Sequence, residues 1–275
     1  MDTDLRDKVI LITGASGGIG SATARAFAAE GAKLVLHYHQ QRAKAEALSA
    51  ALAPAETLLV GANLRNEAEV ATLFAAAVGK FGRVDSLVAN AGVWPPEHVL
   101  LADLTLDRWQ ATLDTDLTSV FLCCREFLRY ARPRGRGNIT LIGSTAGVFG
   151  EAGHADYSAA KSAIAYGLTR TLKNELSRLL PHTADYCGGR VNCVCPGWVL
   201  TRMSSGALND GGKVQRVLAT MALPQLARPE DIANTVVFLS SDKLARHMTG
   251  QTVVVAGGME GRWLWLPEEI NPGAV

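Results

Sequence analysis

Short apolar runs alternate along the chain with longer stretches in which apolar residues recur every three or four positions. The first run, residues 8–13 (KVILIT), is almost uninterrupted, as is typical of a parallel strand covered on both faces. The pattern predicts strands at residues 8–13, 33–38, 57–61, 86–89, 138–143, 190–195 and 251–255, and helices at 21–29, 42–52, 67–81, 105–130, 157–180 and 229–240. We therefore expect an α/β fold.

The 275 residues can bury one large core, and no linker-like segment divides them. We expect a single domain over residues 1–275. Periodicity weakens and glycines cluster at residues 198–226, which predicts a mobile lid over a site. The tail, residues 259–275, carries Trp263 and Trp265, and we expect it to pack on another surface because two exposed tryptophans would be unusual.

Charge and composition exclude several classes of function. The formal net charge is +1, which predicts no electrostatic footprint for nucleic acid or an anionic membrane. No apolar stretch approaches the roughly 20 residues of a membrane helix, and the first residues lack the order of a signal peptide. We expect a cytoplasmic protein with neither a nucleic-acid nor a membrane partner.

The five cysteines are odd in number and lie mostly in apolar runs, which predicts buried thiols in place of disulfides. Cys193 and Cys195 would share one face of a strand. No CxxC or HxxxH pair accompanies them, so we expect no metal site.

Glycines follow the first predicted strand at once. Gly14, Gly18 and Gly20 form a G-x-x-x-G-x-G pattern that opens the first predicted helix. A strand-to-helix turn of this kind presents free N–H groups and the positive end of a helix dipole, which favours a bound anion. The alternative is that the glycines merely allow a sharp turn.

The end of the second predicted strand bears on the choice of cofactor. Dinucleotide folds that use NAD commonly place an acid there, whereas basic and polar groups receive the 2′-phosphate of NADP. This chain has no acid at that point and offers donors and one fixed cation in residues 37–42 (HYHQQR). The pattern favours NADP(H), with NAD(H) possible, although a solvated loop would look similar.

A hydroxyl, a phenol and an ammonium occur within one short segment, at Ser144, Tyr157 and Lys161. Tyr157 and Lys161 are four apart and would lie one turn apart on a helix. We expect the ammonium to lower the pKa of the phenol and make it a proton shuttle, with Ser144 donating to a substrate oxygen. An isolated Y-x-x-x-K is more often an ordinary amphipathic helix.

These motifs together resemble the short-chain dehydrogenase/reductase family. The resemblance rests on TGASGGIG at residues 13–20, NAG at 90–92, Ser144, Tyr157 with Lys161, and PGWVLT at 196–201. It implies a Rossmann-like, doubly wound domain with a seven-stranded parallel sheet flanked by helices, a nicotinamide cofactor, and homodimers or homotetramers built on the helices that start near Thr105 and Tyr157.

The resemblance also implies residue roles. Tyr157 would be the acid/base, Lys161 would hold the nicotinamide ribose and lower the tyrosine pKa, and Ser144 would orient the substrate oxygen. The residues implied to contact the cofactor, besides Tyr157 and Lys161, are Gly14, Ser16, Gly18, Ile19, Gly20, Tyr38, His39, Asn63, Leu64, Asn90, Val199 and Thr201.

Two positions in the site depart from the family pattern. Asn63 stands where an aspartate usually receives the adenine amino group, and its amide oxygen can still accept. Asp116 stands where the family has an asparagine whose helix kink serves a proton relay. We expect Asp116 to belong to the catalytic group and, as a carboxylate, to oppose phenolate formation at Tyr157.

The sequence therefore predicts an NADP(H)-dependent oxidoreductase that interconverts a ketone and a secondary alcohol. The alternative is a dinucleotide-binding regulator or scaffold that kept the fold and lost turnover, with Asp116 as its support. The mixture of aromatic and aliphatic residues expected around the substrate predicts a moderately apolar small molecule. These residues are Trp94, Pro95, Pro96, Phe149, His154, Trp198 and the lid from Met203 to Leu226.

Overall fold

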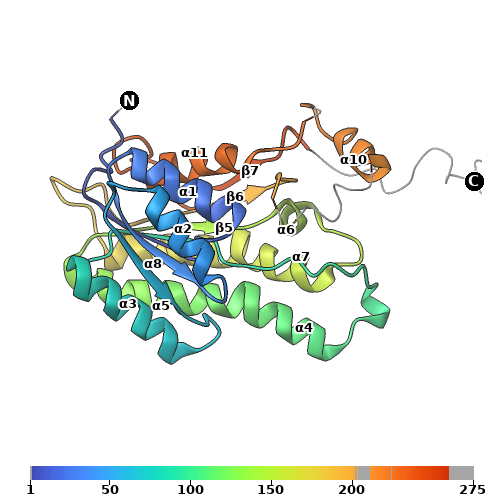
Figure 1. The fold of residues 1–275 in the computed structure, drawn as a ribbon, viewed down its shortest axis with the longest axis horizontal. Helices are drawn as coiled ribbons and strands as arrows, with labels where there is room; N and C mark the ends of the chain where they lie inside the picture. The colour runs from blue at the N-terminus through green and yellow to red at the C-terminus, as the bar shows by residue number, and fades with distance from the viewer. Residues whose placement is uncertain (1, 202, 204–210, 224, 260–275) are drawn as a thin grey trace, which may run out of the picture.

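Seven parallel strands form the centre of the protein (Figure 1). The computed structural model describes residues 2–201, 203, 211–223 and 225–259. The strand order is β3-β2-β1-β4-β5-β6-β7. The strands are β1 (Val9–Ile12), β2 (Lys33–Tyr38), β3 (Thr57–Gly61), β4 (Ser86–Ala89), β5 (Asn138–Ile142), β6 (Arg190–Pro196) and β7 (Thr252–Val255). The prediction of a seven-stranded parallel sheet is confirmed.

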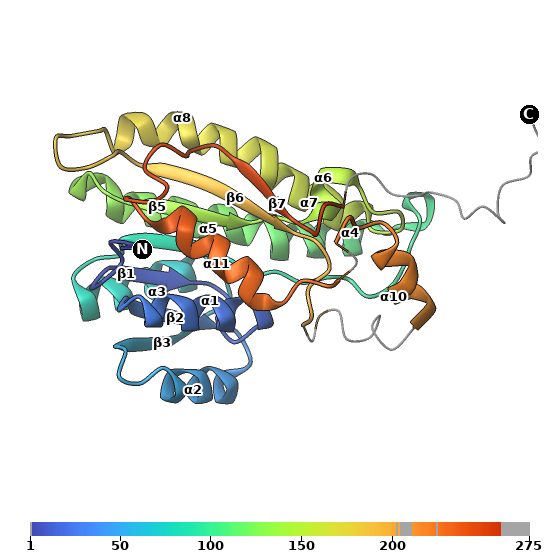
Figure 2. The same cartoon turned by 90° about the horizontal axis from the view of Figure 1, so that it is seen from above.

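Helices cover both faces of this sheet (Figure 2). Alternate residues of β1 point to opposite faces, so that Ile10 and Ile12 belong to one core cluster and Val9 and Leu11 to the other. The doubly wound architecture is therefore confirmed. The first cluster includes residues of α1 (Gly18–Ala29), α2 (Arg42–Ala51) and α11 (Pro229–Ser240), and the second includes residues of α3 (Glu67–Phe81), α5 (Ser119–Ala131) and α8 (Thr169–Leu179).

The strand order reverses at β1, which lies between β2 and β4. In open α/β sheets, the loops at such a point diverge and leave a crevice beyond the carboxyl ends of the strands, where ligands bind. The carboxyl ends of β1, β4 and β5 lead directly to Gly14, Asn90 and Ser144. The topology thus brings three of the predicted site segments to one edge of the sheet.

The two long predicted helices are irregular. The first consists of α4 (Leu106–Leu113) and α5, joined by the π-helical turn η2 (Asp114–Thr118). The second consists of α7 (Ala155–Ser162) and α8, joined by the π-helical turn η4 (Ala163–Leu168). Each segment is helical throughout, as predicted, but a π-turn adds a residue to one turn, which apolar periodicity does not reveal. Turn η2 places Asp116 in the interior.

A short helix that the pattern did not predict, α6 (Thr145–Phe149), lies between β5 and α7. In the region predicted as a lid, Val199 bridges to Ala227 and α10 (Gly211–Leu218) forms another helix. Residues 202, 204–210 and 224 of that lid, and the tail from residue 260 with Trp263 and Trp265, lie outside the described residues.

The five cysteines are free thiols, as predicted, and four of them are buried. The Sγ atoms of Cys193 and Cys195 lie 3.8 Å apart on one face of β6. In the described ranges, no helix is long and apolar enough to cross a membrane. No group of three His, Cys, Asp or Glu side chains in this part of the chain is placed to hold a metal ion.

His37 ties the carboxyl ends of three strands together. Its Nδ1 accepts a hydrogen bond from the Gly14 N–H (3.0 Å), and its Nε2 lies 2.9 Å from the Ala62 carbonyl oxygen. This pattern needs a neutral imidazole with its proton on Nε2. Burial lowers the pKa of His37 to about 4, so the ring is neutral at pH 7. The expectation that His37 offers a donor to a cofactor is wrong, because both ring nitrogens are engaged by the fold.

These contacts predict a fold that acid destabilises. The folded state keeps His37 neutral down to about pH 4, whereas an unfolded chain protonates it below about pH 6.5. The unfolded state binds more protons between these values, so this residue's contribution to the free energy of unfolding falls by about 3 kcal/mol as the pH drops through that window. His37→Gln keeps a donor and an acceptor but does not titrate.

The measurement is urea unfolding of parent and His37→Gln at pH 7 and at about pH 4.5. We expect the stability advantage of the parent to shrink at the lower pH. An advantage that is the same at both values would contradict the assigned neutral, buried imidazole.

Candidate active site

The loop after β1 forms a cradle at the start of α1. The helix begins at Gly18 with no side chain capping its N-terminus and no acidic residue in its first turn, so its free N–H groups and dipole favour an anion. Gly14 has a φ of +65°, and a Cβ on Gly20 would lie 2.3 Å from the Gly14 carbonyl oxygen. A Cβ on Gly18 would lie 2.6 Å from Thr201 Cγ2. These close contacts fix the shape of the turn, on which Ser16 and Ile19 are half-buried.

Asn90 and Thr13 hold this cradle against β4. The Asn90 side chain donates to the carbonyl oxygens of Thr13 (2.9 Å) and Gly14 (3.2 Å). The Thr13 hydroxyl accepts from the N–H groups of Asn90 and Ala91, both at 2.9 Å. Asn90 thus shapes the loop that would receive the cofactor, in addition to the contact along the cofactor that the family resemblance implies.

The end of β2 presents Tyr38 and His39 beside the cradle. Tyr38 is half-buried, and its ring covers Gly61 of β3 so closely that a Cβ there would lie 3.0 Å from it. His39 is exposed. Arg42, at the start of α2, is largely exposed and pairs with Glu46 (2.8 Å). A 2′-phosphate bound here would meet one cation, Arg42. The exposed ion pair of Arg42 with Glu46 contributes little stability, so Arg42 can pair with the phosphate in its place.

The residues after β3 are arranged differently from the expectation. The Asn63 amide oxygen accepts from the Arg65 backbone N–H (3.1 Å) and lies 3.4 Å from Arg65 Nε. The Asn63 N–H donates to Glu69 (2.6 Å). This oxygen therefore already serves a local turn, which leaves it less available to an adenine amino group. Leu64 is buried next to it.

Ser144, Tyr157 and Lys161 come together where α6 and α7 meet. Ser144 caps the N-terminus of α6, accepting from the Ala146 N–H (3.1 Å), and its hydroxyl acts to lower the pKa of the Tyr157 phenol. Lys161 Nζ lies 5.6 Å from the centre of the Tyr157 ring. Tyr157 and Lys161 are 7% and 4% exposed. A Cβ on Gly147 would lie 2.5 Å from the Lys161 backbone, so a glycine is what lets the two helices approach.

Asp116 completes the surroundings of Lys161. Lys161 Nζ donates to the Ile142 carbonyl oxygen (3.3 Å) and lies 3.4 Å from Asp116 Oδ1. The same carboxylate oxygen accepts from the Val93 N–H (3.0 Å), whereas Oδ2 is buried with no hydrogen-bond partner in the described part of the chain. A Cβ on Gly92 would lie 2.4 Å from Asp116 Oδ1 and 3.0 Å from Lys161 Nζ. Asp116 therefore fixes both the lysine and the loop after β4.

The electrostatics differ from the expectation at Tyr157. Burial raises the pKa of this phenol, and the lowering by Lys161 does not compensate for burial and the Asp116 carboxylate together. The expected lowered pKa is thus wrong for the chain alone. Burial also raises the pKa of Asp116 despite the nearby ammonium. Burial opposes the charge on Lys161, but the Asp116 carboxylate and the Tyr157 phenol together outweigh it, and the pKa of Lys161 is raised.

Two of the residues expected to shape the substrate site lie next to Tyr157. The Trp94 ring packs 4.0 Å from the His154 ring and 4.9 Å from the Tyr157 ring, measured between centroids. Of the others, Pro95 and Trp198 are half-buried and Pro96 and Phe149 are exposed. Val199 is buried and Thr201 half-buried at the start of the predicted lid.

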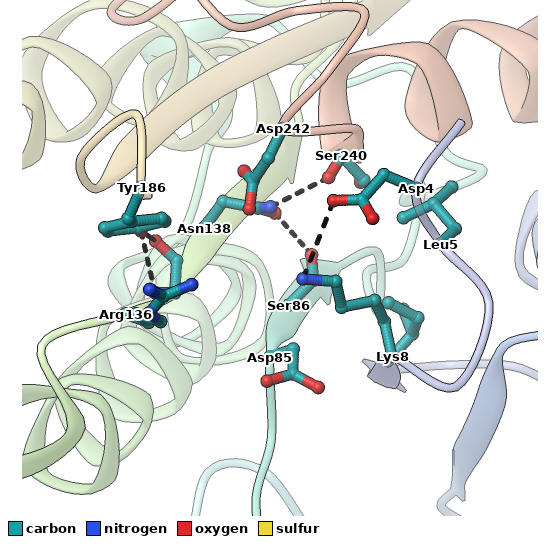
Figure 3. A pocket seen from close by; sticks show the side chains of 12 residues that line it. Asp4, Leu5, Lys8, Asp85, Ser86, Arg136, Asn138, Tyr186, Ser240 and Asp242 are labelled. Carbon is teal, nitrogen blue, oxygen red and sulfur yellow. Dashed lines mark hydrogen bonds and ion pairs between the residues drawn. The ribbon is translucent and has the colours of Figure 1, made fainter. Parts of the chain in front are cut away.

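A small cavity lies at the opposite, amino end of the strands (Figure 3). It encloses about 30 Å³, enough for a water molecule. Its walls are joined by their own hydrogen bonds, from Ser86 to Asn138 (2.5 Å) and from Asn138 to the Ser240 carbonyl oxygen (2.8 Å). None of the predicted site residues lines it.

One polar cluster beside the site was not predicted. Asp156 is fully buried and accepts from Thr112 (2.8 Å) and Arg108 (3.1 Å) of α4. Burial alone would raise the pKa of Asp156, but these hydrogen bonds outweigh it and the pKa is lowered. The cluster fastens the start of α7, directly before Tyr157, to α4. Asp156 lies 44 residues from Thr112 and 48 residues from Arg108 in the sequence, so no local pattern indicates their contact.

Comparison with known proteins agrees with this geometry. The chain matches the family described as Enoyl-(Acyl carrier protein) reductase over residues 14–260. It is 39% identical over 259 residues to a 3-oxoacyl-[acyl-carrier-protein] reductase of Synechocystis sp., covering 94% of this chain and 98% of that protein. The chain belongs to the short-chain dehydrogenase/reductase family. As a member it is an oxidoreductase acting on CH–OH groups.

Other similar proteins have names that give different substrates. A cis-4-hydroxycyclohexanecarboxylate dehydrogenase of Sinomonas cyclohexanicum is 36% identical, covering 92% of this chain and 96% of that protein. The crystal structure of levodione reductase superimposes with a TM-score of 0.84 at 29% identity, over 92% of this chain and 97% of that one.

The position of Asp116 predicts a shifted pH dependence. Its carboxylate raises the pKa of Tyr157, so removing the charge should lower that pKa and favour phenolate. We expect Asp116→Asn to remain active and to move the basic limb of the alcohol-oxidation rate toward lower pH. The measurement is a pair of pH–rate profiles. Superimposable limbs would show that Asp116 does not act on the tyrosine electrostatically, and an inactive variant would show a different role.

Proposed function

We propose that the protein is an NADP(H)-dependent oxidoreductase that interconverts a ketone and a secondary alcohol, with Tyr157 as the acid/base. The observation that carries the proposal is the convergence of the Ser144 hydroxyl, the Tyr157 phenol and the Lys161 ammonium at one end of the sheet, beside the glycine cradle. Ser144 follows the carboxyl end of the buried strand β5, and Tyr157 and Lys161 are buried residues of α7.

A bound nicotinamide ring would supply the hydride for ketone reduction and accept it for alcohol oxidation. In the reductive direction, Tyr157 donates its phenolic proton to the substrate oxygen as negative charge develops there. The Ser144 hydroxyl donates a second hydrogen bond to that oxygen. Lys161 stabilises the phenolate that remains, and Asp116 keeps the ammonium in place. In oxidation the phenolate takes the proton from the alcohol.

The turn from Gly14 to Gly20 would hold the pyrophosphate, and the region of Tyr38 and His39 would hold the adenosine ribose. Support for NADP(H) comes from the absence of an acid at residues 37–42 and from Arg42, whose surface pair with Glu46 is worth little. Asn63, Leu64, Val199 and Thr201 complete the proposed cofactor site. NAD(H) stays possible because a single exposed cation gives modest discrimination.

The alternative of an inactive scaffold has little support. Its sequence argument was Asp116, yet this residue keeps Lys161 in place as an ion-pair partner, one helical turn from Tyr157. Named relatives are reductases and dehydrogenases. Their substrates are of two kinds, an open 3-oxoacyl chain on a carrier protein and a six-membered ring, and this chain's substrate is a small carbonyl or alcohol of one of these kinds.

We also infer a homodimer or homotetramer built on the α4/α5 and α7/α8 faces. Support comes from large apolar side chains left in solvent on the first face, with Leu106 76% and Phe121 45% exposed. A second copy would cover such residues. The cytoplasmic location and the lack of nucleic-acid and membrane partners stay predictions from composition.

Tyr157→Phe keeps the shape of the ring and removes the transferable proton. We expect turnover to fall by roughly 10²-fold or more, with the dissociation constant of the dinucleotide little changed. Steady-state kinetics with ketones and a separate fluorescence titration with NADPH measure the two quantities. A variant that retained near-normal turnover would show that another group moves the proton.

Tyr38→Asp tests the cofactor preference. A carboxylate at the end of β2 would repel the 2′-phosphate and accept from ribose hydroxyls, so it should reverse or erase a preference for NADPH over NADH. The parent and variant are compared by kcat/KM for the two cofactors at a fixed substrate concentration. Equal values in the parent would exclude the proposed NADP(H) preference.

A further inference from the structure

Two loops meet in front of Tyr157 and are fastened to each other. The first follows β4 and the second precedes α7. The Val99 N–H donates to the Gly153 carbonyl oxygen (3.0 Å). Gly153 has a φ of +76°, and a Cβ there would lie 2.3 Å from the His98 ring, so the loops touch at a glycine. The Val93 N–H is held by Asp116 (3.0 Å), which anchors the other end of the first loop.

These loops hold a corner of aromatic rings. The Trp94 ring lies 4.0 Å from the His154 ring at an interplanar angle of 35°, and His154 is 6% exposed. The Trp94 ring is nearly perpendicular to the Tyr157 ring, at 78° and 4.9 Å. His98 packs edge-on against His154 at 6.1 Å. The indole is therefore supported from behind and stands beside the proposed catalytic phenol.

The corner restricts what can reach the phenol. Tyr157 is only 7% exposed and the Trp94 ring lies 4.9 Å from it, so a substrate oxygen at the phenol would come close to the indole. A compact, rigid ring can lie against two perpendicular walls at once and loses little conformational entropy there. A flexible chain loses rotational freedom when it is ordered in the same fixed corner. Hydrogen bonds already hold the two loops in place, so the aromatic corner can favour rigid rings over flexible chains without a rearrangement.

The charges on the two loops also favour an uncharged substrate. The loops, residues 90–105 and 150–154, contain no lysine or arginine, and their only basic side chains are the imidazoles of His98 and His154. They do carry acids, including the exposed Glu97 and the half-buried Glu151. A thioester carried on a phosphopantetheine arm has a phosphodiester group. The acidic side chains of these loops would repel that group, and the loops have no lysine or arginine to pair with it.

We propose that Trp94, held beside Tyr157 by His154, selects compact, uncharged cyclic ketones and their alcohols over open-chain 3-oxoacyl thioesters on a phosphopantetheine arm. This inference rests on the proposed function and adds the substrate class. Trp94 is a specificity residue that contacts the substrate and takes no part in proton transfer.

The test compares three ketones that separate shape from charge. Cyclohexanone is a neutral ring, ethyl acetoacetate a neutral open chain, and acetoacetyl-coenzyme A an open chain with phosphates. We expect the parent to give a kcat/KM for cyclohexanone at least about tenfold above that for either open-chain ketone, as for one well-placed ring contact. A parent that prefers acetoacetyl-coenzyme A overturns the inference.

Trp94→Ala should lower kcat/KM for cyclohexanone by about tenfold, mainly through KM, and change the value for ethyl acetoacetate by less than about twofold. Trp94→Phe keeps an aromatic wall and should retain most of the selectivity. The matched control is Trp109→Phe, which alters a half-buried tryptophan on the neighbouring α4 and should change neither value. Circular dichroism and NADPH titration establish that each variant is folded.

The outcomes are distinguishable. Turnover with a substrate ratio that Trp94→Ala leaves unchanged overturns the inference and leaves the proposed function standing. No turnover of any ketone by the parent overturns the proposed function and this inference with it. If Trp94→Ala does not fold, Trp94→Leu takes its place, and the preference of the parent still decides.

Discussion

The buried contact between Lys161 and Asp116 is the interaction on which the site depends. An ammonium that is 4% exposed needs compensation, which it receives from a carboxylate at 3.4 Å and a backbone carbonyl at 3.3 Å. Breaking such a pair by removing one charge leaves the other uncompensated in the interior. Because Lys161 lies one turn from Tyr157, and Asp116 also holds the Val93 N–H, one ion pair aligns α7, the π-turn η2 and the loop after β4.

The position of this site is set by the topology of the sheet. Parallel strands deliver their carboxyl ends to one edge, and the reversal of strand order at β1 opens that edge between two loops. Glycines then set how closely the segments approach. Gly20 touches the loop of Gly14, and Gly147 touches the backbone of Lys161. The polar groups therefore converge because backbones with no Cβ between them can meet.

The sheet and most helices could be predicted because each strand is a continuous apolar run with a turn signal after it. Ser144, Tyr157 and Lys161 could be singled out because their chemistry is local or matches a family motif. The direction of the shift in the Tyr157 pKa could not be predicted. It depends mainly on burial, which arises when the whole chain packs and is not encoded in Y-x-x-x-K. The same holds for His37, which pattern alone placed near a cofactor and which instead holds the Gly14 loop. The π-turns and the Asp156 cluster depend on packing between distant segments, so apolar periodicity does not predict them.

The contact of Gly92 with Asp116 also bears on how this site can change over evolutionary time. A methyl group at position 92 would lie 2.4 Å from the Asp116 carboxylate oxygen and 3.0 Å from Lys161 Nζ, so an alanine there requires these side chains to shift. That shift would disturb the ion pair that holds the lysine. A shorter side chain at 116 would make room for the methyl group, but it would leave Lys161 without its charged partner. The two positions are thus coupled, and lineages that keep the buried aspartate should tend to keep the glycine.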